Sequence, residues 1–239
     1  MKELVVVLMI FVSAIASKAQ GIIVSEELRS NSTILDVKGK QGWQFNQVIS
    51  FGGFHTSKIK RSWSAGIDMD FFERFRAARE KLSFTQYTPD SLSCTIIAVS
   101  RFFSDETEFL DGFMGYSWKF VNSFAGAIML QNSTENSWEF LISDPDLILE
   151  KNAGCGIVKD KNGNQISIHG VTKMEGQPKW VPAEVWGYEF FQDGISVAAV
   201  SIAGNGRVYI KNDLTPELKL IISAVSSSLL VRHNLMDNS

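Results

Sequence analysis

The stretch from Leu220 to Val231 constrains the fold more than any other part of the chain, because it is apolar on nearly every side. It carries no charge, and serines are its only polar residues. Thr215 can cap a helix before it, Pro216 suits the first helical turn, and Glu217 complements the helix dipole there. A helix that is apolar all round must be enclosed, and this run is too short for a bilayer, which takes about 20 residues.

We therefore predict a helix packed inside the protein, with a peripheral membrane anchor as the alternative reading. The serines are compatible with burial, because their hydroxyl groups can bond back to carbonyls of their own helix.

Most of the remaining chain is patterned for β-structure. Trp43–Ile49 and Lys58–Trp63 alternate apolar and polar residues, as half-buried strands do. Turn residues such as Asn162-Gly163, Asp193-Gly194 and Asn205-Gly206 separate other short runs. Further strands are predicted at Leu82–Tyr87, Cys94–Phe103, Tyr116–Val121, Gly126–Gln131, Trp138–Ser143, Gly156–Lys159, Gln165–Val171, Val185–Phe191, Ser196–Ala203 and Arg207–Lys211.

One amphipathic helix is predicted in the first half of the chain. Asp70 provides a carboxylate cap, and Phe71, Phe75, Ala78 and Leu82 follow at helical spacing. The predicted fold class is thus mainly β with two helices (α+β). Its architecture is an antiparallel β-barrel, or a sandwich, that encloses the hydrophobic C-terminal helix.

The N-terminus reads as a cleavable secretory signal peptide, residues 1–19. A short charged region precedes the apolar run Leu4–Ile15, and small residues up to Ala19 allow cleavage before Gln20. Ala14-Ile15-Ala16 is a second possible site, and a retained membrane anchor is the alternative. Residues 20–239 then form one domain, because no linker or low-complexity tract divides them.

Charge and cysteine content narrow the classes of partner. Cleavage lowers the basic residues from 23 to 21 and the acidic residues from 26 to 25, which gives a net charge of about −4. Such a chain lacks the positive field on which nucleic-acid binding relies. Cys94 and Cys155 are predicted as two buried free thiols, although export also makes a disulfide possible.

No catalytic, metal-binding or cofactor-binding motif stands out, and none of these sites is predicted. His55, His169 and His233 show no metal-ligand spacing, and Asp160–Asn164 reads as a hairpin turn rather than a calcium loop. His233 is interpreted as a cap at the end of the C-terminal helix.

Aromatic residues supply the best binding candidates. The sequence repeats Trp-x-Phe at Trp43, Trp118 and Trp138, and both rings of such a pair point to one face of a strand, most simply the core. Trp180 and Trp186 flank a proline in a predicted loop, where an exposed indole can bind a ligand. Lys58 and Lys60, on the polar face of their predicted strand, complete the candidate ligand-binding set.

The C-terminal third also carries a family resemblance. Gly156–Ile166 is a strand, a turn and a strand, Gly187–Val200 is a second hairpin, and Arg207–Lys211 precedes the apolar helix. This order, over about residues 150–233, resembles the tubby-like superfamily of tubby domains, phospholipid scramblases and LURP-one-related proteins. The resemblance implies a closed β-barrel that wraps a hydrophobic C-terminal helix.

Two departures from that family limit what the resemblance implies. Its members are mostly intracellular, whereas this chain carries an export signal, and its phosphoinositide-binding basic residues have no matching positions here. The predicted function is a non-catalytic, exported domain of bacterial type that binds a ligand, lipid or envelope protein in the periplasm or outside the cell. The alternatives are an exported hydrolase with a site built from scattered residues and a structural subunit of an envelope assembly.

Overall fold

The fold is known from a computed structural model, which describes residues 21–41, 46–61, 80–100, 123–131, 137–143, 154–178 and 184–236. Within these ranges, antiparallel strands form one closed barrel in the ring order β1-β12-β11-β10-β9-β8-β7-β6-β5-β4-β3-β2. The strands are β1 (Ser32–Lys38), β2 (Ser50–Phe51), β3 (Phe54–Thr56), β4 (Glu80–Tyr87), β5 (Ser93–Ser100), β6 (Ser123–Leu130), β7 (Ser137–Ser143), β8 (Gly154–Asp160), β9 (Gln165–Val171), β10 (Gly187–Gln192), β11 (Ile195–Ser201) and β12 (Arg207–Lys211).

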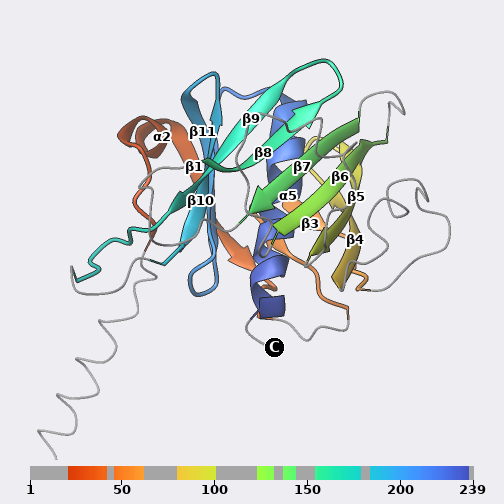
Figure 1. The fold of residues 1–239 in the computed structure, drawn as a ribbon, viewed down its shortest axis with the longest axis horizontal. Coiled ribbons are helices and arrows are strands. Elements are labelled where there is room, and N and C mark those ends of the chain that lie inside the picture. The colour runs from red at the N-terminus through yellow and green to blue at the C-terminus, as the bar shows by residue number, and fades with distance from the viewer. Residues whose placement is uncertain are drawn as a thin grey trace, which may run out of the picture.

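Two helices accompany the barrel in the described ranges: α2 (Glu26–Asn31) and α5 (Pro216–Met236). In Figure 1, α5 runs between the strands, while α2 lies on the outside beside β11. The architecture is therefore the predicted barrel with a C-terminal helix, and the sandwich alternative is wrong.

Tight turns connect the strands at the rim where α5 begins, which we call the helix-start rim. Asp193 and Gly194 both have positive φ, 51° and 79°, as a two-residue hairpin turn of the right twist requires. In the turn after β8, Asp160 accepts backbone hydrogen bonds of 2.8 Å from Asn162 and Asn164. This is the predicted hairpin turn.

The barrel closes where the first and last strands meet. β1 pairs with β12 from Ser32↔Lys211 to Asp36↔Arg207, which joins residues far apart in the sequence. Its other neighbour, β2, pairs only with Val37 and Lys38.

Helix α5 fills the barrel, as the sequence predicts. Every residue from Leu220 to Arg232 is buried. A helix that is covered on all faces over more than three turns can only be surrounded, and the side chains around it come from every part of the wall. Its start is capped as expected, since Leu218 N donates to Thr215 Oγ1 at 3.3 Å.

The buried serines of α5 behave partly as predicted. Ser223 and Ser228 donate to the carbonyls of Leu220 and Ala224 at 2.8 and 2.9 Å. Ser227 instead reaches a distant partner, because it donates to Oε1 of Gln86 on β4 at 2.7 Å. This buried bond fixes α5 against the wall at one position along its length.

Several sequence predictions are corrected by the structure. Leu82 lies in β4, so the predicted helix from Asp70 does not extend to it; residues 70–79 lie outside the described residues. Gln47 to Ile49 and Lys58 to Ile59 are not strands; they are joined instead by single bonds from Ile59 N to the Gln47 carbonyl and from Thr56 N to the Ile49 carbonyl, both 2.9 Å. The rest of these two predicted strands, residues 43–45 and 62–63, lies outside the described residues. β1 and α2 were not predicted, and Tyr116–Val121 lies outside the described residues.

Other predictions hold. Cys94 and Cys155 are buried free thiols. Trp138 and Phe140 of one Trp-x-Phe pair point into the core, while the pairs at Trp43 and Trp118 lie outside the described residues.

Candidate functional site

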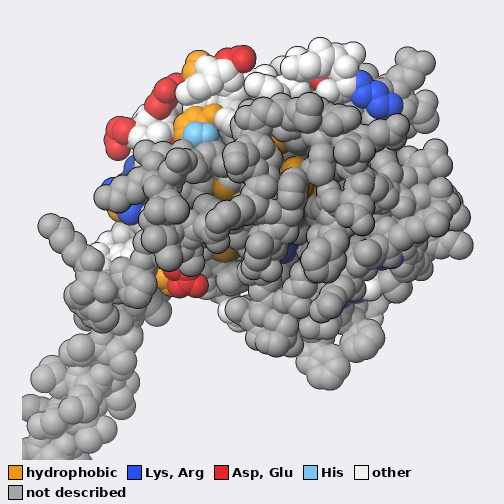
Figure 2. Space-filling view, in the orientation of Figure 1, with side chains coloured by type: hydrophobic (Ala, Val, Ile, Leu, Met, Phe, Trp, Pro, Cys, Tyr) orange, Lys and Arg blue, Asp and Glu red, His pale blue; other side chains and the backbone are white. Residues whose placement is uncertain are grey.

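The described residues bring polar side chains together on the outer face of β9 to β12, beneath and beside α2; we call this surface the α2 face. In Figure 2, acidic side chains gather along the edge of the molecule where α2 lies, next to hydrophobic side chains and a histidine. The surface follows from the barrel, because alternate residues of each strand point outward.

A satellite apolar cluster attaches the N-terminal segment to this face. Its buried residues come from that segment and from three strands: Ile22, Leu28, Val171, Ala199 and Tyr209. The segment also pairs with the chain after β9, through a bridge between Ile22 and Met174. Residues from Gly21 onward are thus part of the fold.

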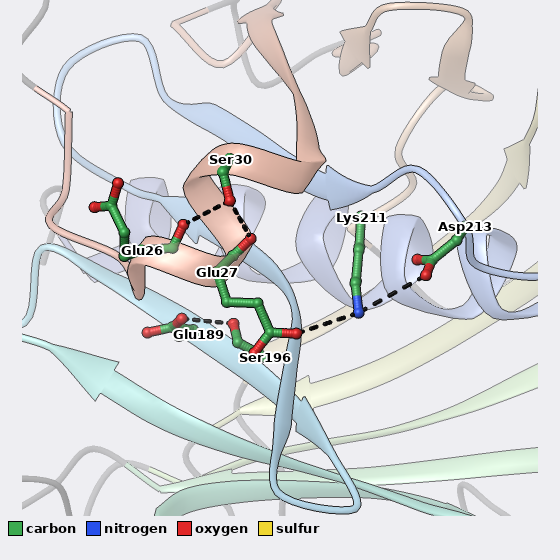
Figure 3. Close-up of polar contacts among 7 residues, drawn as sticks. All are labelled: Glu26, Glu27, Ser30, Glu189, Ser196, Lys211 and Asp213. Carbon is green, nitrogen blue, oxygen red and sulfur yellow. Dashed lines mark hydrogen bonds and ion pairs between the residues drawn. The ribbon is translucent and has the colours of Figure 1, made fainter.

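Glu189 is the buried carboxylate of the α2 face, with 8% of its surface exposed. Its Oε1 accepts a hydrogen bond from Ser196 Oγ at 2.5 Å (Figure 3). The same oxygen accepts one from Ser25 N at 3.1 Å. Ser25 is the residue that precedes α2, so the carboxylate lies at the positive end of this short helix. Glu189 therefore ties α2 to β10 and β11.

His169 lies opposite Glu189 in the pairing of β9 with β10. Its ring contacts Phe191 at 4.7 Å between centroids. Burial lowers the pKa of His169 below its ordinary value, and the charge of Glu189 only partly opposes that effect. The histidine is accordingly favoured in its neutral form.

The order of Ser196, Glu189 and His169 limits what they can do chemically. In a serine hydrolase, the histidine stands between the serine and the carboxylate, so that it can take the hydroxyl proton. Here Ser196 donates directly to the carboxylate. The arrangement positions α2; it does not activate a nucleophile.

Ion pairs surround the cluster. Arg29 meets Glu175 at 2.8 Å, and Arg207 meets Asp36 at 3.0 Å. Burial raises the pKa of Tyr209, a neighbour of Arg207, although the nearby arginine lowers it in part. These pairs link the N-terminal segment, β1, β12 and the chain after β9.

Lys211 extends this network to the helix-start rim. Its Nζ lies 3.5 Å from Glu27 of α2 and 3.8 Å from Asp213, which follows β12 (Figure 3). The lysine side chain is only 16% exposed, while the side chains of Glu27 and Asp213 are mostly exposed. The surface at this rim therefore presents carboxylate groups to solvent.

The structure does not bring the predicted ligand-binding residues together. Trp186 precedes β10, is half-buried and packs against the satellite apolar cluster. Lys58 and Lys60 are exposed, and Lys60 pairs with Ser83 of β4, on the opposite side of the barrel from β10. Trp180 lies outside the described residues.

The other histidines also have defined places. His55 is exposed on β3 and stacks on Tyr87, with ring centroids 5.0 Å apart. His233 lies within α5, which continues to Met236, so it is not the end of that helix as predicted.

A buried lysine, Lys40, lies at the opposite rim. Its Nζ donates to the carbonyl of Ile202 and, at 3.0 Å, to that of Gly204. Gln47 in turn donates to the Lys40 carbonyl at 2.9 Å. The lysine thus joins the chain after β1 to the turn between β11 and β12.

Sequence reasoning missed Glu189, Ser196 and α2. The signal that could have marked Glu189 is its place among apolar residues in Gly187–Phe191, where a lone acid must find partners if it is buried. Among the described residues, no group of three or more histidines, cysteines or acids could hold a metal ion. In the same ranges, no helix is both long and apolar enough to cross a membrane.

The chain matches no family model, no curated protein and no solved structure.

Proposed function

We propose that this chain is a non-catalytic, exported binding domain, whose partner meets the outer surface of the barrel. One observation carries the proposal: α5 occupies the interior, with Leu220 to Arg232 buried. In barrels of this kind that bind a small ligand inside, the lumen must be open to it. Here the chain itself fills the lumen, and recognition is left to the outside.

The polar groups of the α2 face support the same proposal. Glu189, Ser196 and Lys211 bond to segments of the chain itself, and these bonds hold α2 and the strand ends in place. A rigid scaffold with its polar residues engaged in this way presents a fixed surface, which lowers the entropic cost of binding.

The export part of the proposal rests on the N-terminal sequence. Cleavage before Gln20 preserves the pairing of Ile22 with Met174 and the contacts of Leu28, since both residues follow the cleaved bond. The resemblance to the tubby-like superfamily belongs to the proposal as well, because a barrel closed around its C-terminal helix is the architecture that it implies.

The test has two parts. Expression of the full chain in a bacterial host should yield a product that begins at Gln20 and leaves the cytoplasm, as read by N-terminal sequencing and cell fractionation. The purified product should then retain envelope proteins or float with vesicles of envelope lipids, while a heat-unfolded sample should lose that selectivity. Retention of neither class, with a correctly folded sample, would overturn the binding function.

A further inference from the structure

The first strand of the barrel has one edge that is only partly paired. β12 pairs with β1 along Ser32 to Asp36, but β2 on the other side pairs only with Val37 and Lys38. No described strand lies beside Ser32 to Ile34 on that side. In the part of the chain that the structure describes, the closed barrel therefore keeps a short unpaired edge, the kind of site where another strand can add.

The direction of the backbone groups shows which residues present this edge. Asn212 N donates to the Asn31 carbonyl at 3.0 Å, and Val37 N donates to the Gly206 carbonyl at 3.2 Å, so Asn31 and Val37 point toward β12. Backbone groups alternate along a strand. Ser32, Ile34 and Asp36 thus point their N–H and C=O groups away from β12, toward the open edge.

The β2–β3 turn marks the end of the unpaired edge on the side of Leu35. A Cβ on Gly52 would lie 2.9 Å from Leu35 Cδ2, and one on Gly53 would lie 2.6 Å from Pro89 Cγ. The turn is thus wedged between β1 and the chain after β4, and it closes the wall at the level of Leu35. Between this turn and the start of β1, no described strand pairs with Ser32 to Ile34 on that side.

The side chains beside the edge indicate the chemistry of an occupant. Ile34 is 50% exposed on the outer face. The carboxylate of Asp36, two positions away on the same strand, is 80% exposed, whereas its basic partner Arg207 is 29% exposed. A complementary segment presents an apolar residue to Ile34 and a basic residue opposite Asp36, and basic residues on both sides of the apolar one meet this requirement in either strand direction.

We propose that an extended segment of a partner protein, apolar at its centre and basic on both sides, adds to β1 along Ser32 to Ile34. The alternating N–H and C=O groups of a strand edge can pair with another extended backbone, which then replaces their hydrogen bonds to water. This inference deepens the proposed binding function and rests on it.

Ile34→Pro is the deciding variant. Ile34 N–H is not used in the pairing with β12, so proline removes an edge donor without breaking the barrel ladder, and proline is tolerated at such edge positions. Ile34→Thr is the matched control, because it keeps the donor and removes only exposed apolar surface. Urea unfolding of both variants verifies that they fold as the wild type does.

The probe is a fluorescein-labelled peptide, Ser-Lys-Thr-Val-Thr-Lys-Ser, titrated by fluorescence anisotropy. We expect saturable binding to the wild type, binding about tenfold or more weaker for Ile34→Pro, and a loss of only a few fold for Ile34→Thr. Amide exchange of Ile34 in the wild-type chain should slow when the peptide is added. Equal binding by Ile34→Pro, no binding by the wild type, or unchanged Ile34 exchange would overturn the inference.

Capture from an envelope fraction separates this inference from the proposed function. If the wild type and Ile34→Pro retain the same proteins equally, the binding function stands and the edge is not its site. If the wild type retains nothing and floats with no vesicle, the binding function itself fails. A wild-type dimer that Ile34→Pro converts to a monomer would make a second copy the occupant and would also overturn the partner proposed here.

Discussion

At the scale of single residues, Glu189 shows how the barrel and the N-terminal segment depend on each other. Its carboxylate accepts hydrogen bonds from Ser196 of β11 and from Ser25, which lies 164 positions before Glu189 in the sequence. Hydrogen bonds to an ionised group are stronger than those between neutral groups. The carboxylate of Glu189 is therefore a buried polar attachment of α2 to the wall, beside the more exposed ion pairs of Arg29 and Glu27.

Glu189→Gln should weaken that attachment while keeping the size of the side chain. We expect a loss of about 1–2 kcal/mol in the free energy of unfolding, because both bonds become neutral. Amide exchange of Leu28 should accelerate more than that of residues in β5. Glu26→Gln is the control, because Glu26 is an exposed acid of α2, and it should change the free energy of unfolding by less than about 0.5 kcal/mol.

His169 gives a dependence on pH with a defined sign. Because its pKa is lowered in the folded state, the unfolded chain takes up a proton first as the pH falls below the ordinary histidine value. The free energy of unfolding should therefore decrease as the pH falls from the ordinary histidine pKa to the lower pKa of folded His169. Below the lower value, both states bind the proton and the decrease stops. Urea midpoints at several pH values should show a smaller decline for His169→Gln, and an identical decline would contradict the assignment.

At the scale of elements, α5 is both the most predictable part of the chain and the part that organises the rest. Its stretch from Leu220 to Val231 is apolar on nearly every side, and the structure buries all of these residues. The strands of the wall pack their inward-facing apolar residues around the helix, as Ile166 and Ile168 of β9 do. The interior therefore has no place for a charge without a partner.

Val225→Asp should prevent folding of the barrel. Val225 is fully buried in the middle of α5, and an unpaired carboxylate there costs several kcal/mol, a large part of the stability of a domain. Circular dichroism and the yield of folded protein measure the effect. Glu217→Gln, at the exposed start of the same helix, should fold normally, and a Val225→Asp variant as stable as the wild type would refute the enclosed position of α5.

Elements with a clear pattern were predictable, and contacts between distant segments were not. β9 and β12 have the predicted bounds, because Gln165–Val171 alternates inner and outer residues and Arg207–Lys211 lies between turns. β1 was missed because Ile34 is exposed while its neighbour Leu35 faces the core, which blurs the alternation. Glu189 could not be assigned a role, because its partner Ser25 is fixed only by how α2 packs on the finished barrel.

At the scale of the whole molecule, a main core and a satellite cluster hold the described parts together. The main apolar cluster includes Val37 of β1, Phe140 of β7 and Leu230 of α5, and the satellite apolar cluster is built on the outer face of β9, β11 and β12, whose inner faces belong to the main cluster. Closure of the ring between β1 and β12 adds a link between distant parts of the chain. These features favour a single cooperative unit.

The chain should therefore unfold in one transition. Circular dichroism, tryptophan fluorescence and reaction of Cys94 and Cys155 with a thiol reagent should share one midpoint in urea, because both thiols are buried in the folded state. Two separated midpoints would show that the chain contains more than one cooperative unit.

The position of α5 at the end of the strand order has a consequence for how the molecule assembles. As the chain emerges from the amino end, β1 to β12 are made before the helix that supplies the centre of their core. Consecutive strands of the wall pair as hairpins, but the pairing of β1 with β12 and the contacts of α5 with the wall join distant parts of the chain, so the inner face is buried only once α5 is present. Contacts between distant segments form late, and until then the apolar inner face of the strands is exposed to solvent. The closed and filled barrel therefore forms only after α5 has been synthesised.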